Sequence, residues 1–234
     1  YVRRFGFRRL LRDQHHQDSR YAGAGPMDEI LRIEDLRVTY RERERTLRAA
    51  DGVTLSLRPG RTLALVGESG SGKTTVALAA LNLVPQPGSI DAGRVIYDGR
   101  DLLAIPSEQL RRLRGREISM IFQDPVSGLN PVLSIGTQVE EIVRAHLGAP
   151  RREARRRAIE ALAAQGLSNP ERIMSAYPFH LSGGMCQRVM IAIATVLRPR
   201  VIIADEPTSA LDVTIQAAIL HELGTLKRDL GVSL

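Results

Sequence analysis

A glycine-rich stretch with one lysine carries the clearest chemistry in this sequence. Residues 67–72 read GESGSG, and they continue directly into Lys73 and Thr74. Glycine reaches backbone angles that are closed to other residues, so successive amide N–H groups of such a loop can point inward and hold an anion. A lysine ammonium suits the β- and γ-phosphates of a nucleotide, and a threonine hydroxyl suits Mg²⁺. These residue types in this order predict a P-loop, a site for a nucleoside triphosphate and Mg²⁺.

The choice of lysine at this place supports the prediction. Only two of the 33 basic residues are lysines, Lys73 and Lys227, and the rest are arginines. A chain that uses arginine almost everywhere has a compact ammonium at the one spot where phosphate binding needs it. A glycine-rich turn with a stray lysine is therefore the weaker interpretation.

A second acidic motif follows a short apolar run. Residues 201–204 read VIIA, and Asp205 and Glu206 come next. A carboxylate at the end of a buried strand can hold Mg²⁺ directly or through water, so we expect Asp205 to do this. Glu206 is then placed to act as the general base that polarises the attacking water. Alone this pattern fits any strand end, but beside a P-loop it indicates the second half of the same site.

A third motif, LSGGMCQR at residues 181–188, opens another helix. Ser182, Gly183 and Gly184 leave the first amides of that helix free to bind an anion. One nucleotide does not need two such helix ends in one subunit. The second end is therefore expected to serve a nucleotide held by another copy or partner.

The surrounding pattern supplies the elements that must position these residues. We predict strands at residues 30–40, 53–57, 63–66, 95–97, 118–122 and 201–204. The strand at 95–97 lies within an otherwise turn-rich stretch at 88–99. Helices are predicted at 73–83, 107–113, 133–147, 151–166, 170–177, 185–196 and 213–226. Ser107 and Asn169 are the expected caps of two of them. Residues 231–234 resemble the start of a further apolar strand.

Composition limits the class of protein. The 234 residues are 43% hydrophobic and 25% charged, and no apolar run approaches the roughly 20 residues of a membrane span. The single cysteine, Cys186, excludes an intrachain disulfide and a cysteine-based metal cluster. The net charge of +7 comes largely from residues 1–26, which carry six arginines against two aspartates. Because the remainder is nearly balanced, the charge is a poor argument for nucleic-acid binding. We expect residues 1–26 to be a basic, disordered extension; a basic amphipathic element that touches anionic lipid or a partner is the alternative.

Taken together, the motifs resemble the ATP-binding subunit of an ABC transporter. LSGGMCQ is similar to that family's signature motif, residues 122–124 (FQD) to its Q-loop, and residues 207–212 (PTSALD) to its D-loop region. The resemblance implies an α/β fold: a P-loop NTPase (RecA-like) core with an antiparallel β subdomain and an α-helical insertion. It places the core at 27–123 and 186–234 and the helical subdomain at about 124–185.

The resemblance also implies roles for individual residues. The expected catalytic residues are Lys73, Gln123 and Glu206, and the expected metal ligands are Thr74, Gln123 and Asp205. The expected ATP-contacting residues are Tyr40, which would stack on adenine, and Gly67, Glu68, Ser69, Gly70, Ser71, Gly72, Lys73, Thr74, Thr75, Gln123, Ser182, Gly183 and Gly184. ATP and Mg²⁺ are the implied cofactors.

A closer resemblance is to the dipeptide, oligopeptide and nickel importer branch, carried by GESGSGKT, IFQDPVSGLNP, YPFHLSGGM and DEPTSALDVTIQA. It implies ATP-driven import of peptides or nickel at the cytoplasmic face of the inner membrane. The implied partners are a second ATPase subunit, two permease subunits and, indirectly, an extracytoplasmic binding protein, with no nucleic acid. A non-transport ABC ATPase that acts on nucleic acid or the ribosome is the alternative. Such proteins usually carry zinc-binding cysteine pairs, a long coiled-coil insertion or a second cassette, and these are not visible here.

Two departures from the family pattern stand out. Cys186 occupies a signature position where close relatives usually carry arginine, and helical spacing turns it away from the phosphate, so we expect little effect. The family's switch histidine should follow the next strand, whereas this sequence ends at Leu234. His15, His16, His146, His180 and His221 match no catalytic position. We therefore expect a C-terminally truncated ATPase that binds MgATP but hydrolyses it poorly.

Overall fold

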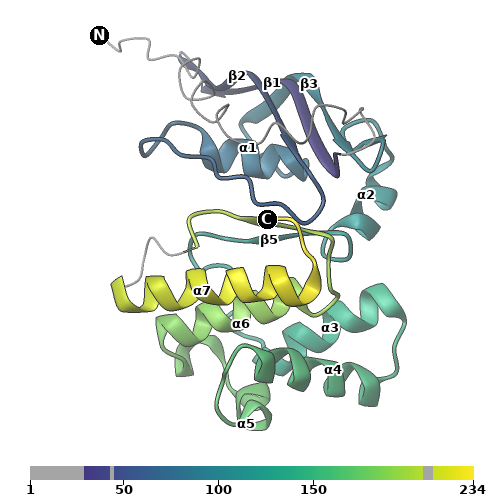
Figure 1. Ribbon diagram of the computed structural model, residues 1–234, viewed down its shortest axis with the longest axis vertical. Helices are drawn as coiled ribbons and strands as arrows, with labels where there is room; N and C mark the ends of the chain where they lie inside the picture. Colours follow the sequence, from purple (N-terminus) through teal and green to yellow (C-terminus); the bar gives the residue numbers. More distant parts are fainter. Residues whose placement is uncertain (1–28, 43–44, 208–212) are drawn as a thin grey trace, which may run out of the picture.

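The computed structural model describes residues 29–42, 45–207 and 213–234. The predicted extension at residues 1–26 and most of the D-loop region lie outside this range. Figure 1 shows an antiparallel sheet at one end of the molecule and a group of helices at the other, with a short parallel sheet between them. In the part of the chain that the structure describes, no helix is long and apolar enough to cross a membrane.

The antiparallel sheet has the strand order β2-β1-β3-β4. Its strands are β1 (Leu31–Glu42), β2 (Arg45–Leu57), β3 (Gly88–Tyr97) and β4 (Arg100–Asp101). In β1, Ile33 and Val38 are buried against the core, and Ile33 faces Leu55 on one side and Val95 on the other. The register shifts around Asp35, whose φ is 43°, so that Leu36 also reaches the buried face.

The parallel sheet joins β5 (Ile118–Ile121) to β6 (Val201–Ala204) in register from one end to the other. All four residues of β5 are buried, as expected for a parallel strand covered on both faces. Helix α1 (Lys73–Ala80) lies between this sheet and the antiparallel one (Figure 1). The two sheets and α1 share one hydrophobic core, which includes Val76 and Val201.

The helices at the other end form a second core. They are α3 (Ile135–Leu147), α4 (Arg151–Ala164), α5 (Pro170–Ser175) and α6 (Gly183–Thr195). Side-chain caps start three of them: Ser134 accepts from Thr137 N, Asn169 from Arg172 N and Ser182 from Met185 N. Helix α6 also contributes Ile191 to a third cluster with β5, β6 and α7 (Val213–Leu230), so it links the helical group to the parallel sheet.

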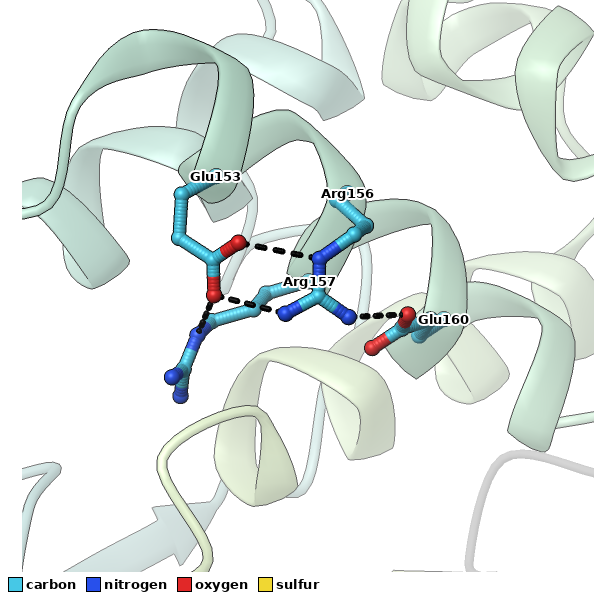
Figure 2. A network of polar contacts seen from close by, with 4 residues as sticks. All are labelled: Glu153, Arg156, Arg157 and Glu160. Atoms are coloured by element: carbon cyan, nitrogen blue, oxygen red, sulfur yellow. Dashed lines mark hydrogen bonds and ion pairs between the residues drawn. The ribbon is translucent and has the colours of Figure 1, made fainter.

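Helix α4 carries an exposed network of ion pairs on its outer face (Figure 2). Glu153 accepts from Arg156 and Arg157, and Arg156 also pairs with Glu160. These partners are three or four residues apart, so they meet on one side of the helix. The hydrogen bonds from the two arginines lower the pKa of Glu153 to about 2 from its ordinary 4.5.

The predicted fold class is confirmed, but the bounds of several predicted helices and strands are corrected by the structure. The stretch 88–99 is a regular strand, β3, over residues 88–97 rather than a turn-rich segment with a strand at 95–97, because it pairs with most of β1. Helix α1 ends at Ala80, not at residue 83, and Asn82 follows with a φ of 51°. The residue that caps α2 (Ser107–Leu113) is Pro106, so Ser107 is its first residue and not its cap.

Residues 63–66, predicted as a strand, have no regular secondary structure and lie outside both sheets. Among the described residues, the backbone of this segment pairs with another segment at its start, where Leu63 N donates to Leu234 O and Leu234 N donates to Arg61 O. A strand is defined by its hydrogen-bonded neighbours, and the described residues pair with this segment only at Arg61 and Leu63.

The helical core can be tested with a pair of leucines. Leu162 is fully buried in α4, whereas Leu147 at the end of α3 is 40% exposed. Leu162→Ala should lower the free energy of unfolding by about 3 kcal/mol because it leaves a cavity, and Leu147→Ala by less than about 1 kcal/mol. Urea unfolding followed by circular dichroism measures both. Equal losses for the two variants would show that the helical core is not packed as described.

The ion-pair network predicts a pH dependence. Because the folded-state pKa of Glu153 is depressed, its contribution to stability is present above pH 4.5 and is lost as the pH falls towards 2. The Tm of the unsubstituted chain should therefore fall more between pH 5 and pH 2 than the Tm of Glu153→Gln. Glu171→Gln, at another exposed glutamate in a first helical turn, serves as the control and should behave like the unsubstituted chain. Parallel Tm curves for all three proteins would contradict the assignment.

Candidate functional site

The predicted P-loop joins the segment at residues 61–66 to the start of α1. Gly70 and Gly72 have φ values of 78° and 95°, which side chains rarely adopt. A Cβ on Gly72 would also lie 2.0 Å from the carbonyl oxygen of Ala49, so glycine is required there twice over. Gly72 is the N-cap of α1 and offers no side-chain cap, and the first turn of α1 holds no acidic residue. This helix end is therefore open to an external anion.

Lys73 folds back over the loop. Its Nζ donates to the carbonyl oxygens of Gly67 and Glu68, each at 3.0 Å, and lies 3.4 Å from Oε1 of Glu206. The ammonium is thus held among oxygen atoms at the place where phosphate oxygens would lie. A polyphosphate would offer the same cation stronger, charge-assisted acceptors.

Ser71 adds a buried hydroxyl to the loop. Its Oγ is inaccessible and has no hydrogen-bond partner among the described residues. A buried hydroxyl without a partner costs free energy, so such a group commonly marks a place where a ligand or water completes the hydrogen bonds. Glu68, Ser69 and Gly70 are exposed, and Thr75 is half-buried.

Thr74 and Asp205 meet across 131 positions of sequence. Oγ1 of Thr74 donates to Oδ1 of Asp205 at 3.1 Å, and Asp205 is 7% exposed at the end of β6. Burial raises the pKa of Asp205, against the Thr74 hydrogen bond that lowers it. Mg²⁺ is usually held by one or two protein oxygens together with substrate phosphates and water, and this pair fits that pattern. No group of three or more His, Cys, Asp or Glu side chains suited to a metal occurs among the described residues.

Gln123 and Glu206 close the site from the other side. Gln123 follows β5, and its Nε2 donates to Oε2 of Glu206 at 2.8 Å. Glu206 has a φ of 43°, which is uncommon for a residue other than glycine and is typical of functional positions. Its carboxylate therefore lies between the amide of Gln123 and the ammonium of Lys73. The structure thus brings together all the predicted catalytic and metal-binding residues.

Asp124 has a role that the sequence reasoning missed. Its carboxylate accepts from the amides of Val126 and Ser127 and from the hydroxyl of Ser127. These hydrogen bonds, that from the Ser127 side chain first, lower its pKa. They fix the turn that follows Gln123 and so help to aim the glutamine side chain. The Asp-Pro-Val-Ser sequence, a turn pattern, was the available signal.

The predicted second helix end lies apart from this site. Ser182 and Gly183 are exposed at the start of α6, and a Cβ on Gly183 would meet no atom within 4 Å. Figure 1 shows α1 and α6 on opposite sides of β5. Cys186 is buried in the first turn of α6, with Sγ 3.6 Å from the carbonyl oxygen of Pro178, so it points away from that open end, as helical spacing predicts.

Tyr40 and the described histidines occupy other parts of the fold. Tyr40 is half-buried on β1, close enough to Gly88 that a Cβ there would lie 2.7 Å from its ring. His146 is in the last turn of α3, His180 contacts the rings of Tyr177 and Phe179, and His221 is exposed on α7. None of these three is a partner of Glu206 in the contacts described above, and His15 and His16 lie outside the described residues.

The sequence is similar to those of known proteins of one family. The model of the ABC transporter family matches residues 50–209. A peptidoglycan transport ATP-binding protein, YejF, of Agrobacterium fabrum is 47% identical over 88% of this chain, and a peptide import ATP-binding protein of Brucella abortus is 48% identical over 87%. The chain spans 38% and 61% of the lengths of these two relatives.

Two solved structures of ATP-binding cassettes are similar to this chain. The ATP-binding cassette MJ0796, in a dimeric post-hydrolysis state bound to ADP and Pi, superposes with a TM-score of 0.74 at 30% identity, over 86% of this chain and 84% of that one. The cassette cbiO1 of Clostridium perfringens, part of an ABC transporter complex, superposes with a TM-score of 0.70 at 27% identity, over 88% and 76%. The family model covers more than half of the sequence and the relatives nearly all of it, so the chain belongs to the ABC transporter family, as an ATP-binding cassette of that family.

Proposed function

We propose that this chain binds and hydrolyses ATP as the cytoplasmic subunit of an importer of peptides. The observation that carries the proposal is the convergence of Lys73, Thr74, Gln123, Asp205 and Glu206 at the ends of three elements. The relatives' names supply the substrate class, since one is a peptide import protein and another a peptidoglycan transport protein. Peptides are therefore favoured over nickel as the solute.

Each residue has a defined task in this proposal. The open first turn of α1, the loop amides and the Ser71 hydroxyl bind phosphate oxygens, and Lys73 exchanges its carbonyl partners for the β- and γ-phosphates. Thr74 and Asp205 hold Mg²⁺, whose charge offsets that of the phosphates when it is bound. Glu206 accepts a proton from the attacking water at its carboxylate, and Gln123 orients that carboxylate by its hydrogen bond.

The open end of α6 supports a two-subunit site. In this proposal Ser182, Gly183 and Gly184 contact the γ-phosphate of an ATP held by a second ATPase subunit, identical or different. Ser182 and Gly183 are exposed and Gly184 is half-buried, and α6 lies across the sheet from α1, so they are placed to do so. Two solved structures of one cassette with the same fold, MJ0796, are described as dimeric.

A set of exposed apolar side chains supports a membrane partner. Val126, Val132 and Phe179 are 54%, 77% and 70% exposed, and Tyr177 stacks on Phe179 with ring centroids 5.5 Å apart. The hydrogen bond from Ile135 N to Ala176 O holds the start of α3 beside the segment that carries Tyr177. Apolar groups exposed together commonly mark a protein interface. We assign Val132, Tyr177 and Phe179, whose segments the Ile135 to Ala176 hydrogen bond brings together, to the contact with a permease subunit.

The remaining assembly follows from that assignment. Two permease subunits would hold the ATPase pair at the cytoplasmic face of the inner membrane as a peripheral protein, and an extracytoplasmic binding protein would deliver the solute. The proposed division of the chain is a core at 27–123 and 186–234 and a helical subdomain at about 124–185, with residues 1–26 as an extension. Tyr40 is the proposed contact for adenine.

The two lysines give a matched test of nucleotide binding. Lys73→Ala should weaken MgATP binding by about 10- to 150-fold, the equivalent of one charge-assisted hydrogen-bond partner. Lys227→Ala, in the last turn of α7, should leave the Kd unchanged. Isothermal titration measures both. If the two variants bind MgATP equally well, the phosphate site has been misplaced.

Glu206 should behave differently from Lys73. Glu206→Gln keeps the hydrogen-bonding shape and removes the charge that pairs with Lys73, so MgATP binding should be retained or tightened. Because the general base is lost, the variant should accumulate as an MgATP-bound dimer, which light scattering detects. A loss of binding as large as that of Lys73→Ala would show that the roles of these residues are wrongly assigned.

Turnover provides a third test. The 234-residue chain should bind MgATP yet hydrolyse it slowly in the steady state, because the three described histidines lie at the end of α3, beside Tyr177 and on α7 rather than after β6. Phosphate release measured against time, with excess MgATP, checks this. Robust turnover by this chain alone would refute the proposed need for a histidine beside the site.

A further inference from the structure

A β-bulge in β2 brings the antiparallel sheet against the P-loop. The pairing of β2 with β1 passes from Ala50 directly to Arg48, so Ala49 is the extra residue of the bulge. The carbonyl oxygen of Ala49 lies 2.0 Å from the place that a Cβ on Gly72 would take. The bulge therefore meets the backbone of the P-loop directly and fixes how closely the sheet approaches it.

Tyr40 lies a short way along the same sheet. It pairs with Leu47 of β2 on one side and with Gly88 of β3 on the other. Leu47 is two residues from Ala49, which is about 7 Å along a strand. The sheet thus holds Tyr40 near the P-loop, within the length of one nucleotide, and Figure 1 shows the sheet directly beside α1.

A buried glycine makes room for the ring of Tyr40. A Cβ on Gly88 would lie 2.6 Å from Cγ1 of Val84, 2.7 Å from Cε1 of Tyr40 and 2.9 Å from the carbonyl oxygen of Pro85. Gly88 is not among the residues with a positive φ, so its conformation is open to other residues and only the lack of space excludes a side chain. The ring of Tyr40 instead fills the place on β3 that a side chain of residue 88 would take.

Of the three close neighbours, the ring is the one that can move. The carbonyl oxygen of Pro85 is fixed, because it accepts a hydrogen bond from Gly88 N at 2.8 Å. Val84 belongs to the same turn and packs against the hydrophobic core. The ring of Tyr40 is half-buried and can turn about two side-chain bonds. A methyl group at position 88 would therefore displace the ring.

We propose that Gly88 is a positioning residue for the base of the bound nucleotide. Because Gly88 has no side chain, the ring of Tyr40 keeps the place that the Ala49 bulge sets relative to Gly72. A side chain at position 88 weakens the contact with the base and leaves the phosphate contacts of the P-loop intact. The inference rests on the proposed function, in which Tyr40 contacts adenine.

The experiment compares MgATP with magnesium tripolyphosphate, which offers the phosphates without the base. Gly88→Ala should raise the Kd for MgATP at least about 5-fold, as expected for the loss of a stacked base, and that for tripolyphosphate less than about 2-fold. Gly224→Ala in α7 is the control, since a Cβ there meets only the end of Arg228, at 3.7 Å. It should bind both ligands as the unsubstituted chain does. Isothermal titration measures every Kd.

A double variant separates an effect through Tyr40 from a general loss of stability. Tyr40→Leu alone should also weaken MgATP binding and spare tripolyphosphate binding. Gly88→Ala added to Tyr40→Leu should then cause no further loss, because the ring that the methyl group displaces is gone. If Gly88→Ala alone is unfolded by circular dichroism and the double variant is folded, the methyl group and the ring compete for one space, which supports the proposal.

The other outcomes overturn it. Gly88→Ala may not change the two affinities equally, whether the common change is large or zero, and the double variant may not lose more affinity than Tyr40→Leu; either result would refute a role through Tyr40. A double variant as unfolded as Gly88→Ala would show that Gly88 serves the fold alone. An unsubstituted chain that binds tripolyphosphate as tightly as MgATP would refute the base contact and leave the phosphate site standing. A chain that binds neither ligand would refute the proposed function itself.

Discussion

The parallel pairing of β5 with β6 is the constraint on which the site depends. It places the ends of two strands about 80 residues apart in sequence side by side, with Gln123 after one and Asp205 and Glu206 after the other. Because parallel strands end at the same edge of a sheet, the residues that follow them meet although they are far apart in the sequence. The P-loop must then reach that edge of the sheet. The hydrogen bond from Thr74 to Asp205 shows that it does.

Electrostatics determines which contacts the assembled residues make with one another. The half-buried cluster holds one cation, Lys73, and two carboxylates, those of Asp205 and Glu206. The ammonium of Lys73 contacts two loop carbonyls and the carboxylate of Glu206. A triphosphate with Mg²⁺ brings both the acceptors that Lys73 needs and the cation that Asp205 and Thr74 need. The exchange of partners at Lys73 is thus the first event that the proposed function requires.

Much of the fold could be predicted because its signals are local. The helices from α3 to α6 follow the apolar period, with a cap at Asn169, and β5 and β6 are short, mostly apolar runs. Strand β3 was largely missed because Gly88, Ser89 and Asp91 have low strand propensity, and pairing with β1 overrides it. In the site, the sequence motifs predicted which residues lie close together. The Lys73 to Glu206 pair, the buried Ser71 hydroxyl and the turn held by Asp124 depend on distances that no spacing in the sequence encodes.

The most direct measurement of the central claim uses the scarcity of lysine in this chain. With ¹³C at the lysine ε-carbon, the protein gives two side-chain NMR signals, from Lys73 and Lys227, and Lys227→Ala assigns them. Addition of MgATP should shift the Lys73 signal as its ammonium leaves the carbonyls of Gly67 and Glu68 for phosphate, and should leave the Lys227 signal in place. If MgATP binds and the Lys73 signal does not move, Lys73 does not exchange its partners and the account of the site is wrong.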